Sequence, residues 1–379
     1  MKELYAYYYL ITVVYTTVFM AFGVVLLLGH VPRQAELKNY ISGRRYFSGA
    51  FLFLGIWGII EQATWSPVFG RADSYTYNEV YVMAAVSAIH AWFNGYAYLL
   101  MLNPSSENRR KVLLFGRFGL PAILLALLSI TLLPPSVSRY FIWVLDMIYI
   151  AEISWIFSLC RKTYHINVMA IENYYDEPAR IGWMNNVINL TLILAFFNVV
   201  QYHFPFVGIP LRIANTLFYI YFFMRIIDYI PAFLSIEKVT PLSYDETPAE
   251  KPNDKAPKTP RYYPNNLPNI IATWVASQRF CEENLNINDV AKQMNTNRSY
   301  LSAYLNQHLD ITYSQWLNTL RVEHAKELFM AYPYKNIAEI GVLVGISEPY
   351  NFSRWFKQVT GMSPQQWMEE QYQINNIEK

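Results

Sequence analysis

Two clusters of polar side chains near the end of the chain have residue types that can contact DNA. The first cluster is Asn297, Arg298, Ser299 and Ser302, and the second is Tyr350, Asn351, Ser353, Arg354 and Lys357. An arginine in the major groove can donate two hydrogen bonds to a guanine. Arg354 is therefore the strongest candidate for reading a base, whereas Arg298 is a candidate for a base or a phosphate contact.

The first cluster belongs to a helix-turn-helix pattern at residues 287–308. The residues with inward-facing spacing on its two helices are Val290, Ala291, Met294, Leu301 and Leu305. Asn288 or Asp289 can cap the first helix, and Asn295 begins the turn. The polar cluster is left on the outer face of the second helix, which in this motif enters the major groove.

The second cluster belongs to a repeat of the same pattern at residues 336–359. Gly341 stands fifty positions after Ala291, and Gly345 can end the first helix of the repeat. Ser347 can cap the second helix, with Pro349 in its first turn. A helix at 269–284 precedes the two units, and a long helix at 313–330 links them. The apolar face of the linking helix is predicted to carry Trp316, Leu317, Leu320, Ala325 and Leu328.

These residues resemble those of the AraC/XylS-type transcription regulators. The matching residues of the second unit and its end are Ile337, Ile340, Gly341, Gly345, Ile346, Phe352, Arg354, Phe356, Lys357, Gly361, Ser363 and Pro364. Trp316, Leu317 and Arg321 match in the linking helix. Gly341 and Ile346 depart from the usual alanine and phenylalanine but remain small and apolar. The resemblance implies a DNA-binding domain at 267–372 in which Arg354 faces the DNA.

The charge of this region adds a constraint. From position 261 onward, Lys and Arg number ten and Asp and Glu number eleven, so no positive excess attracts phosphates. Binding then depends on local placement of the cations Lys292, Arg298, Arg321, Lys326, Arg354 and Lys357. Two alternatives remain open: the domain could bind protein instead of DNA, and Arg354 could form a salt bridge with Glu348 or Glu339.

The first 236 residues read as a membrane domain. Seven apolar segments have the length needed to cross a bilayer, at about 4–28, 46–65, 79–102, 112–133, 140–160, 181–203 and 211–234. The first segment is longer than the apolar core of a signal peptide, and seven such lengths in succession argue against a soluble domain. The fold class is all-α: a seven-helix transmembrane domain followed by a soluble all-α domain with two helix-turn-helix units. The arrangement loosely resembles seven-span sensory domains joined to cytoplasmic output domains.

The positive charges between the segments predict an orientation. With the N-terminus outside, the inward loops carry Arg33, Lys38, Arg44, Arg45, Arg109, Arg110, Lys111, Arg161, Lys162 and Arg180. The outward loops carry only Arg71, Arg139 and Arg212. This bias is the positive-inside pattern, so we expect a multi-pass protein of the cell (inner) membrane whose C-terminal domain is cytoplasmic.

Ionisable residues within the predicted spans mark a candidate sensing site. Five of them, Glu61, His90, Asp146, Glu152 and Arg225, are expected at depths where they could line a pocket. The competing interpretation is structural pairing, for example between Arg225 and Asp228. A small-molecule signal and a homodimer both remain open as partners, beside lipid and double-stranded DNA.

A proline-rich polar stretch at 237–266 predicts a disordered linker between the two domains. The two cysteines lie in different domains, and no metal-binding, cofactor-binding or catalytic motif is found, so an enzyme is not expected. The function that these patterns favour is a membrane-anchored, sequence-specific transcription regulator. The alternative is a transporter or channel-like protein with a regulatory C-terminal domain.

Overall fold

The chain folds into two units built almost entirely of helices. The computed structural model describes residues 2–32, 34–65, 77–134, 137, 139–176, 181–203, 207–245 and 264–377. In these ranges the β-structure consists of one isolated antiparallel bridge, between Tyr175 and Asn286. The N-terminal unit comprises Met1–Asn167 and Arg180–Tyr244, and the C-terminal unit comprises Val168–Ala179 and Asp245–Lys379. This confirms the all-α class.

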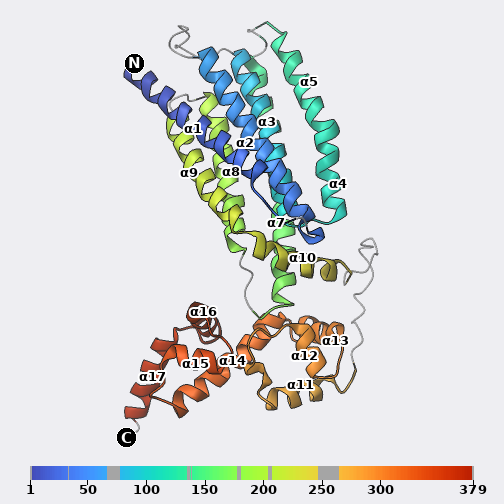
Figure 1. Cartoon of the computed structure of the whole chain (residues 1–379), viewed down its shortest axis with the longest axis vertical. Helices are drawn as coiled ribbons and strands as arrows, with labels where there is room; N and C mark the ends of the chain where they lie inside the picture. Colours follow the sequence, from blue (N-terminus) through green and yellow to red (C-terminus); the bar gives the residue numbers. More distant parts are fainter. Residues whose placement is uncertain are drawn as a thin grey trace. The chain divides into compact units, whose positions relative to one another are not determined.

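The N-terminal unit is a bundle of long helices (Figure 1). Its helices are α1 (Lys2–Leu28), α2 (Lys38–Trp65), α3 (Tyr77–Met101), α4 (Ser106–Leu114), α5 (Leu120–Thr131), α7 (Ile142–Glu172), α8 (Gly182–His203), α9 (Gly208–Ile227) and α10 (Ile230–Asp245). Helix α1 packs along α2 and α9, and α2 packs along α3. Helix α7 begins in this unit, and its last residues belong to the C-terminal unit.

Several predicted spans differ from the observed helices. The segment predicted at 46–65 begins earlier, at Lys38, so Arg44 and Arg45 lie in a helix rather than a loop. The segment at 112–133 combines α4, a π-helical turn at Phe115–Gly119 and α5. The segment at 211–234 is broken, because α9 and α10 meet at an angle of 66°. Among the charges used for the orientation, Arg33, Arg71 and Arg180 lie outside the described residues.

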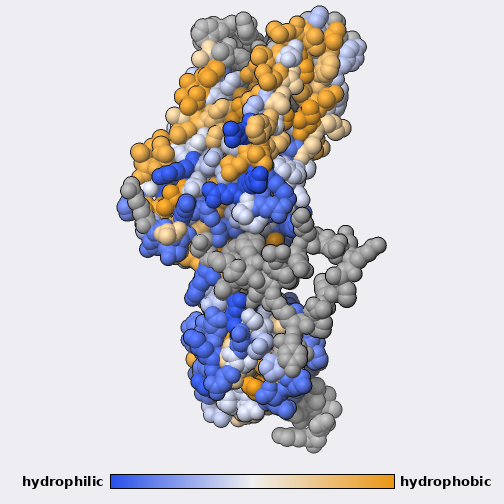
Figure 2. Space-filling view, turned by 90° about the vertical axis from the view of Figure 1, so that its right-hand side faces the viewer, coloured by the Kyte–Doolittle hydropathy of each residue, from blue (hydrophilic) through white to orange (hydrophobic). Residues whose placement is uncertain are grey.

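Five helices of the described chain are long and apolar enough to cross a membrane, and the bent α9–α10 pair would make a sixth. Helix α3 is not among them, so the count of seven spans is not reached by this criterion. Large apolar side chains such as Leu132 and Met147 are exposed on this unit, by 81% and 68%. Figure 2 shows hydrophobic surface along these helices and mostly hydrophilic surface on the C-terminal unit.

Polar contacts tie the bundle together at specific points. Tyr229 Oη donates to the carbonyl oxygen of Met101 at 2.8 Å, and Asn167 Nδ2 donates to the carbonyl oxygen of Leu102 at 2.5 Å. These bonds satisfy carbonyl groups at the end of α3 and in the residue after it, where the helix no longer supplies partners. They therefore fix the end of α3 against α7 and the α9–α10 break.

The C-terminal unit has two groups of helices joined by α14 (Figure 1). Its helices are α11 (Leu267–Ala276), α12 (Ile287–Gln293), α13 (Arg298–Ala303), α14 (Tyr313–Ala331), α15 (Ile337–Leu343), α16 (Pro349–Thr360) and α17 (Pro364–Ile377). The helix predicted at 269–284 ends at Ala276, since Gln278 has a positive φ of 56° and a short 3₁₀ turn follows at Arg279–Cys281. Residues 237–245 of the predicted linker belong to α10, and residues 246–263 lie outside the described ranges.

Candidate nucleic-acid interface

The first helix-turn-helix unit is formed by α12 and α13. Asn286, rather than the predicted Asn288 or Asp289, caps α12: its side-chain oxygen accepts hydrogen bonds from the backbone N–H groups of those two residues. Asn286 does so because its own backbone is extended, as a cap requires. The inward residues of the pattern are buried as predicted; they are Val290, Ala291, Met294, Leu301 and Leu305.

The second unit is formed by α15 and α16. Asn336 and Glu339 form a reciprocal capping box at the start of α15. Gly345 ends the helix with a φ of +80°, a conformation that suits glycine. At Gly341 an added Cβ would lie 2.9 Å from the carbonyl oxygen of Ile346, which explains why glycine occupies a position where the family pattern has alanine.

The start of α16 departs from the prediction. Its cap position is Glu348, which makes no side-chain capping bond, and Ser347 lies one residue further out. Ser347 Oγ instead donates to a carboxylate oxygen of Glu283, in the loop before α12. The second helix-turn-helix unit is thus bonded to the loop that precedes the first.

Helix α14 packs against both units. Val322, Ala325 and Phe329 share one apolar cluster with Phe352, Trp355 and Phe356 of α16. Trp355 was missed by the sequence pattern, because it lies beside rather than along the i, i+4 line of Phe352 and Phe356. Leu320 and Leu328, predicted on the buried face, are only half-buried.

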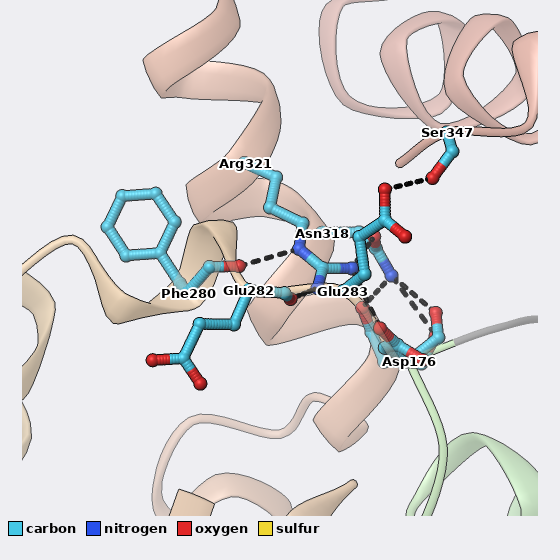
Figure 3. Close-up of polar contacts among 8 residues, drawn as sticks. Asp176, Phe280, Glu282, Glu283, Asn318, Arg321 and Ser347 are labelled. Carbon is cyan, nitrogen blue, oxygen red and sulfur yellow. Dashed lines mark hydrogen bonds and ion pairs between the residues drawn. The ribbon is translucent and has the colours of Figure 1, made fainter. Parts of the chain in front are cut away.

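Arg321 is buried in the domain, contrary to the expectation from the sequence. The sequence suggested that this cation could contribute to DNA binding, but its side chain is 2% exposed. Its Nε donates to the carbonyl oxygen of Phe280 at 2.8 Å, and Nη2 donates to that of Glu282 at 2.7 Å (Figure 3). Its Nη1 forms an ion pair with Asp176 Oδ2 at 3.0 Å. Arg321 therefore holds the loop before α12 onto α14 and is not available to DNA.

Most residues of the two predicted DNA-contacting clusters are at least partly exposed. Asn297 is exposed and caps α13, with its side-chain oxygen accepting from the N–H of Ser299 at 2.7 Å. Tyr350 and Lys357 are exposed on α16. The half-buried members are Arg298, Ser299, Ser302, Ser353 and Arg354.

Asn351 is the exception among these residues. It is 9% exposed and lines a polar cavity of about 200 Å³ together with Asp176, Arg321 and Ser347. Its side chain therefore faces the interior of the C-terminal unit, on the side of α16 that packs against α14.

Arg354 makes no ion pair with Glu348 or Glu339 in the described part of the chain; Glu339 is engaged in its capping box. Its guanidinium carbon lies 5.0 Å from the ring centroid of Trp355, and its Nε is buried without a hydrogen-bond partner. Burial lowers the pKa of Arg354, while Tyr350 and Glu172 favour its charged form. Buried donors without a partner are uncommon in folded proteins, so this N–H group is an unusual feature of α16.

The five ionisable residues predicted to form one intramembrane site do not lie together in the structure. Glu61 and His90 line a cavity of about 130 Å³ inside the N-terminal unit. Asp146 and Glu152 are buried on α7 but are not among its lining residues, and neither carboxylate oxygen of Glu152 has a hydrogen-bond partner. Arg225 is exposed over the ring of Tyr221 and makes no ion pair with Asp228.

The cavity carries an ion pair that the sequence did not indicate. Arg212 donates from Nη2 to Glu61 Oε1, and Asn94, 2% exposed on the cavity wall, leaves its side-chain oxygen without a partner. Among the residues described, no group of three or more His, Cys, Asp or Glu side chains could hold a metal ion.

Residues 290–370 match the family model described as a helix-turn-helix domain. The C-terminal unit thus carries a helix-turn-helix domain. An uncharacterised HTH-type transcriptional regulator of Staphylococcus aureus is 32% identical over 85 residues, which are 22% of this chain and 11% of that protein. The Msm operon regulatory protein of Streptococcus mutans is 31% identical over 108 residues, 28% of this chain and 36% of that protein. No solved structure gave a significant match.

The family match is confined to residues 290–370, and the relatives match over only 85 and 108 residues of this chain. The chain spans only about a tenth to about a third of the length of these relatives. The family match therefore bears on the helix-turn-helix domain.

Proposed function

We propose that this chain is a membrane-anchored, sequence-specific DNA-binding transcription regulator of the AraC/XylS type. The observation that carries the proposal is the pair of capped helix-turn-helix units built on one linking helix, in a domain similar to those of transcriptional regulators. In such motifs the second helix enters the major groove, which assigns recognition to α13 and α16.

A domain with two recognition helices reads two successive major grooves, about 34 Å apart on one face of the duplex. The preferred site is then a direct, non-palindromic sequence of about two helical turns. The groove-contacting residues would be drawn from Arg298, Ser299 and Ser302 on α13 and from Tyr350, Ser353, Arg354 and Lys357 on α16.

Selection of binding sites from a random duplex library tests this proposal. The full chain in lipid nanodiscs should enrich one sequence motif over successive rounds. A chain with Arg298→Ala and Arg354→Ala together should enrich none, while Glu370→Gln, a change at an exposed position of α17, should enrich the same motif as the parent. Enrichment of no motif by the parent would refute sequence-specific binding.

Membrane anchoring is proposed from the N-terminal helices. They are long, apolar and exposed on their sides, as expected for helices surrounded by lipid. The loop charges favour an external N-terminus and a cytoplasmic C-terminal domain. A reporter active only in the cytoplasm should work when fused after Lys238 and fail when fused near Arg71 or Arg139; the opposite pattern would refute this orientation.

The polar cavity of the N-terminal unit favours a sensory role for that unit. A buried ion pair and an unpartnered amide oxygen provide a charged and hydrogen-bonding site for a small polar molecule. Its volume of about 130 Å³ is close to that of protein cavities that hold one benzene-sized molecule, about 150 Å³. The signal would therefore be small.

The same cavity is the one observation that favours the second candidate function, transport. Uptake by proteoliposomes separates the two, with a panel of small zwitterionic and anionic solutes as probes. A sensor should show saturable binding that Glu61→Gln weakens, with no accumulation in the vesicles. Accumulation that depends on Glu61 would support a transporter with a regulatory domain.

A further inference from the structure

A short segment after α7 occupies a surface of the helix-turn-helix domain to which it is distant in sequence. The carbonyl oxygen of Tyr174 accepts a hydrogen bond from the N–H of Ile287 at 3.0 Å, and Tyr175 forms an antiparallel bridge with Asn286. Asn288 Nδ2 donates to Tyr174 Oη at 3.1 Å. The segment thus adds backbone and side-chain bonds to the start of α12, more than 110 positions away.

Asp176 completes this docking on α14. Its carbonyl oxygen accepts from Asn318 Nδ2 at 2.7 Å and from Ser314 Oγ at 3.1 Å, and its carboxylate pairs with Arg321 (Figure 3). Asp176 and Arg321 are 6% and 2% exposed. Ser314, Asn318 and Arg321 recur every three or four residues, so they form one polar stripe on an otherwise apolar helix face.

The docked segment supplies the counter-charge for the one cation of this stripe, Arg321. A buried guanidinium without a counter-charge is strongly unfavourable, and within the described chain Asp176 supplies the carboxylate paired with Arg321. The residues that follow the linker, from 264 onward, do not themselves provide it. The surface is therefore built to receive this segment.

The docked segment lies next to the second recognition helix. Asp176 lines the polar cavity together with Ser347, Asn351 and Trp355, at the N-terminal half of α16. Recognition helices contact base edges with their N-terminal residues, and the segment lies against the inner side of that same half of α16. Glu172, at the end of α7, also acts electrostatically on Arg354. Glu172 therefore places a negative charge near Arg354, a candidate DNA contact, whereas the charge of Asp176 is compensated by Arg321.

We propose that residues 172–176 are a docking element through which α7 holds the helix-turn-helix domain in a state of low DNA affinity. The proposal rests on the DNA-binding function proposed above. Helix α7 runs without a break from the N-terminal unit into this element, so a change in α7 reaches the docking surface through continuous chain. DNA binding requires the element to leave the surface, and DNA binding and docking are then mutually exclusive.

Affinity measurements on the full chain in nanodiscs test the inhibition, with a 40-base-pair duplex of random sequence as the probe. Asp176→Asn removes the charge that pairs with Arg321, and Glu172→Gln removes the charge near Arg354 without touching that ion pair. Each should tighten DNA binding about three- to tenfold. Glu370→Gln removes one negative charge from an exposed position of α17 and should change the affinity less than twofold.

Thermal melting accompanies these measurements, because Asp176→Asn could weaken the fold as well as the docking. If the melting temperature of Asp176→Asn falls below the assay temperature, Glu172→Gln alone decides the result. The inhibitory role is overturned if those of the two variants that remain folded bind DNA no more tightly than the parent chain.

A disulfide tests the docking itself. Residues opposite each other in an antiparallel bridge have Cα atoms about 4.5–5.5 Å apart, within the range of a disulfide. With Cys160 and Cys281 replaced by alanine, Tyr175→Cys with Asn286→Cys should crosslink on oxidation, and Tyr175→Cys with Gln365→Cys should not. The crosslinked chain should bind DNA at least tenfold more weakly than the same chain after reduction.

The outcomes separate this proposal from the one on which it rests. Failure of the Tyr175–Asn286 pair to crosslink overturns the docking. A crosslinked chain that binds DNA as tightly as the reduced chain overturns the inhibition but leaves DNA binding intact. A chain that crosslinks yet binds no DNA in any variant, reduced or docking-deficient, overturns the DNA-binding function as well.

Discussion

Arg212, at the start of α9, donates a hydrogen bond from its guanidinium to the carboxylate of Glu61 in α2, 151 positions earlier in the sequence. Glu61 is 4% exposed and Arg212 is 14% exposed. The guanidinium carbon also lies 5.8 Å from the ring centroid of Tyr15, in α1. Three helices thus converge on one ion pair in the wall of the cavity.

Breaking this pair should destabilise the N-terminal unit. Glu61→Gln preserves the size of the side chain but leaves Arg212 without its counter-charge, a change that costs about 3–5 kcal/mol in buried pairs. Glu107→Gln is the matched control, because Glu107 pairs with Lys111 at 2.7 Å with both side chains at least half exposed, and should cost less than about 1 kcal/mol. Unfolding of each variant in mixed detergent micelles, followed by tryptophan fluorescence, gives the free energies. Equal losses would show that the Glu61 pair is not stabilising.

The core of the helix-turn-helix domain gives a second prediction. Leu301 and Phe356 are fully buried, one in each unit. Replacing either with alanine should lower the free energy of unfolding by about 2–5 kcal/mol, as for other large core truncations. Tyr350→Ala, at a side chain that is 74% exposed, should change it by less than about 0.5 kcal/mol. Denaturant titration of the full chain measures all three, and a parent-like midpoint for Leu301→Ala or Phe356→Ala would place the core elsewhere.

The success of that inward pattern shows what local sequence can predict. Apolar residues spaced by three and four positions fix the buried faces of α12, α13, α15 and α16, since burial follows helical periodicity. The caps were placed one to three residues away from where they lie, because several neighbouring Asn, Asp and Ser residues can each act as a cap. Asn286 acts as the cap because of its extended backbone, which the sequence alone does not reveal.

The polar interior could not be predicted in the same way. Arg321 looks like a surface cation within its own helix, and only its partner explains its burial. That partner, Asp176, lies 145 positions earlier, between the spans predicted at 140–160 and 181–203. Glu61 and Arg212 are separated in the same manner. Long-range pairing of this kind leaves no local periodicity, so charged residues were assigned to loops or to a shared site by position alone.

Arg354 carries the third prediction, on base recognition. Arg354→Ala should remove a bidentate contact with guanine and relax the preference at one base position, by about 1–3 kcal/mol of discrimination. Lys357→Ala is the comparison on the same helix: a lysine that contacts phosphate should weaken binding evenly across sequences and lower the salt slope by about one unit. Affinities for every single-base variant of the selected site measure both effects. If Arg354→Ala keeps the rank order of the parent, Arg354 does not read a base.

The signal between the N-terminal and C-terminal units is expected to pass through α7 and not through residues 246–263. The sequence from 246 to 263 is rich in proline, lysine, aspartate and glutamate, a composition that predicts a flexible tether unable to transmit a rigid motion. Replacing residues 246–258 with a Gly/Ser stretch of equal length should therefore preserve regulation of a promoter reporter. Replacing Asn173–Tyr174–Tyr175 with three glycines leaves the tether intact. It removes the two tyrosine side chains and makes the backbone after α7 more flexible. This change should raise basal DNA occupancy and weaken the response, because the Asn288–Tyr174 side-chain bond is lost and flexible glycines no longer favour the docked backbone conformation. The opposite result, a response lost with the altered tether and kept with the glycine substitution, would assign signal transfer to the tether and leave the contacts of Asp176 with a purely structural role.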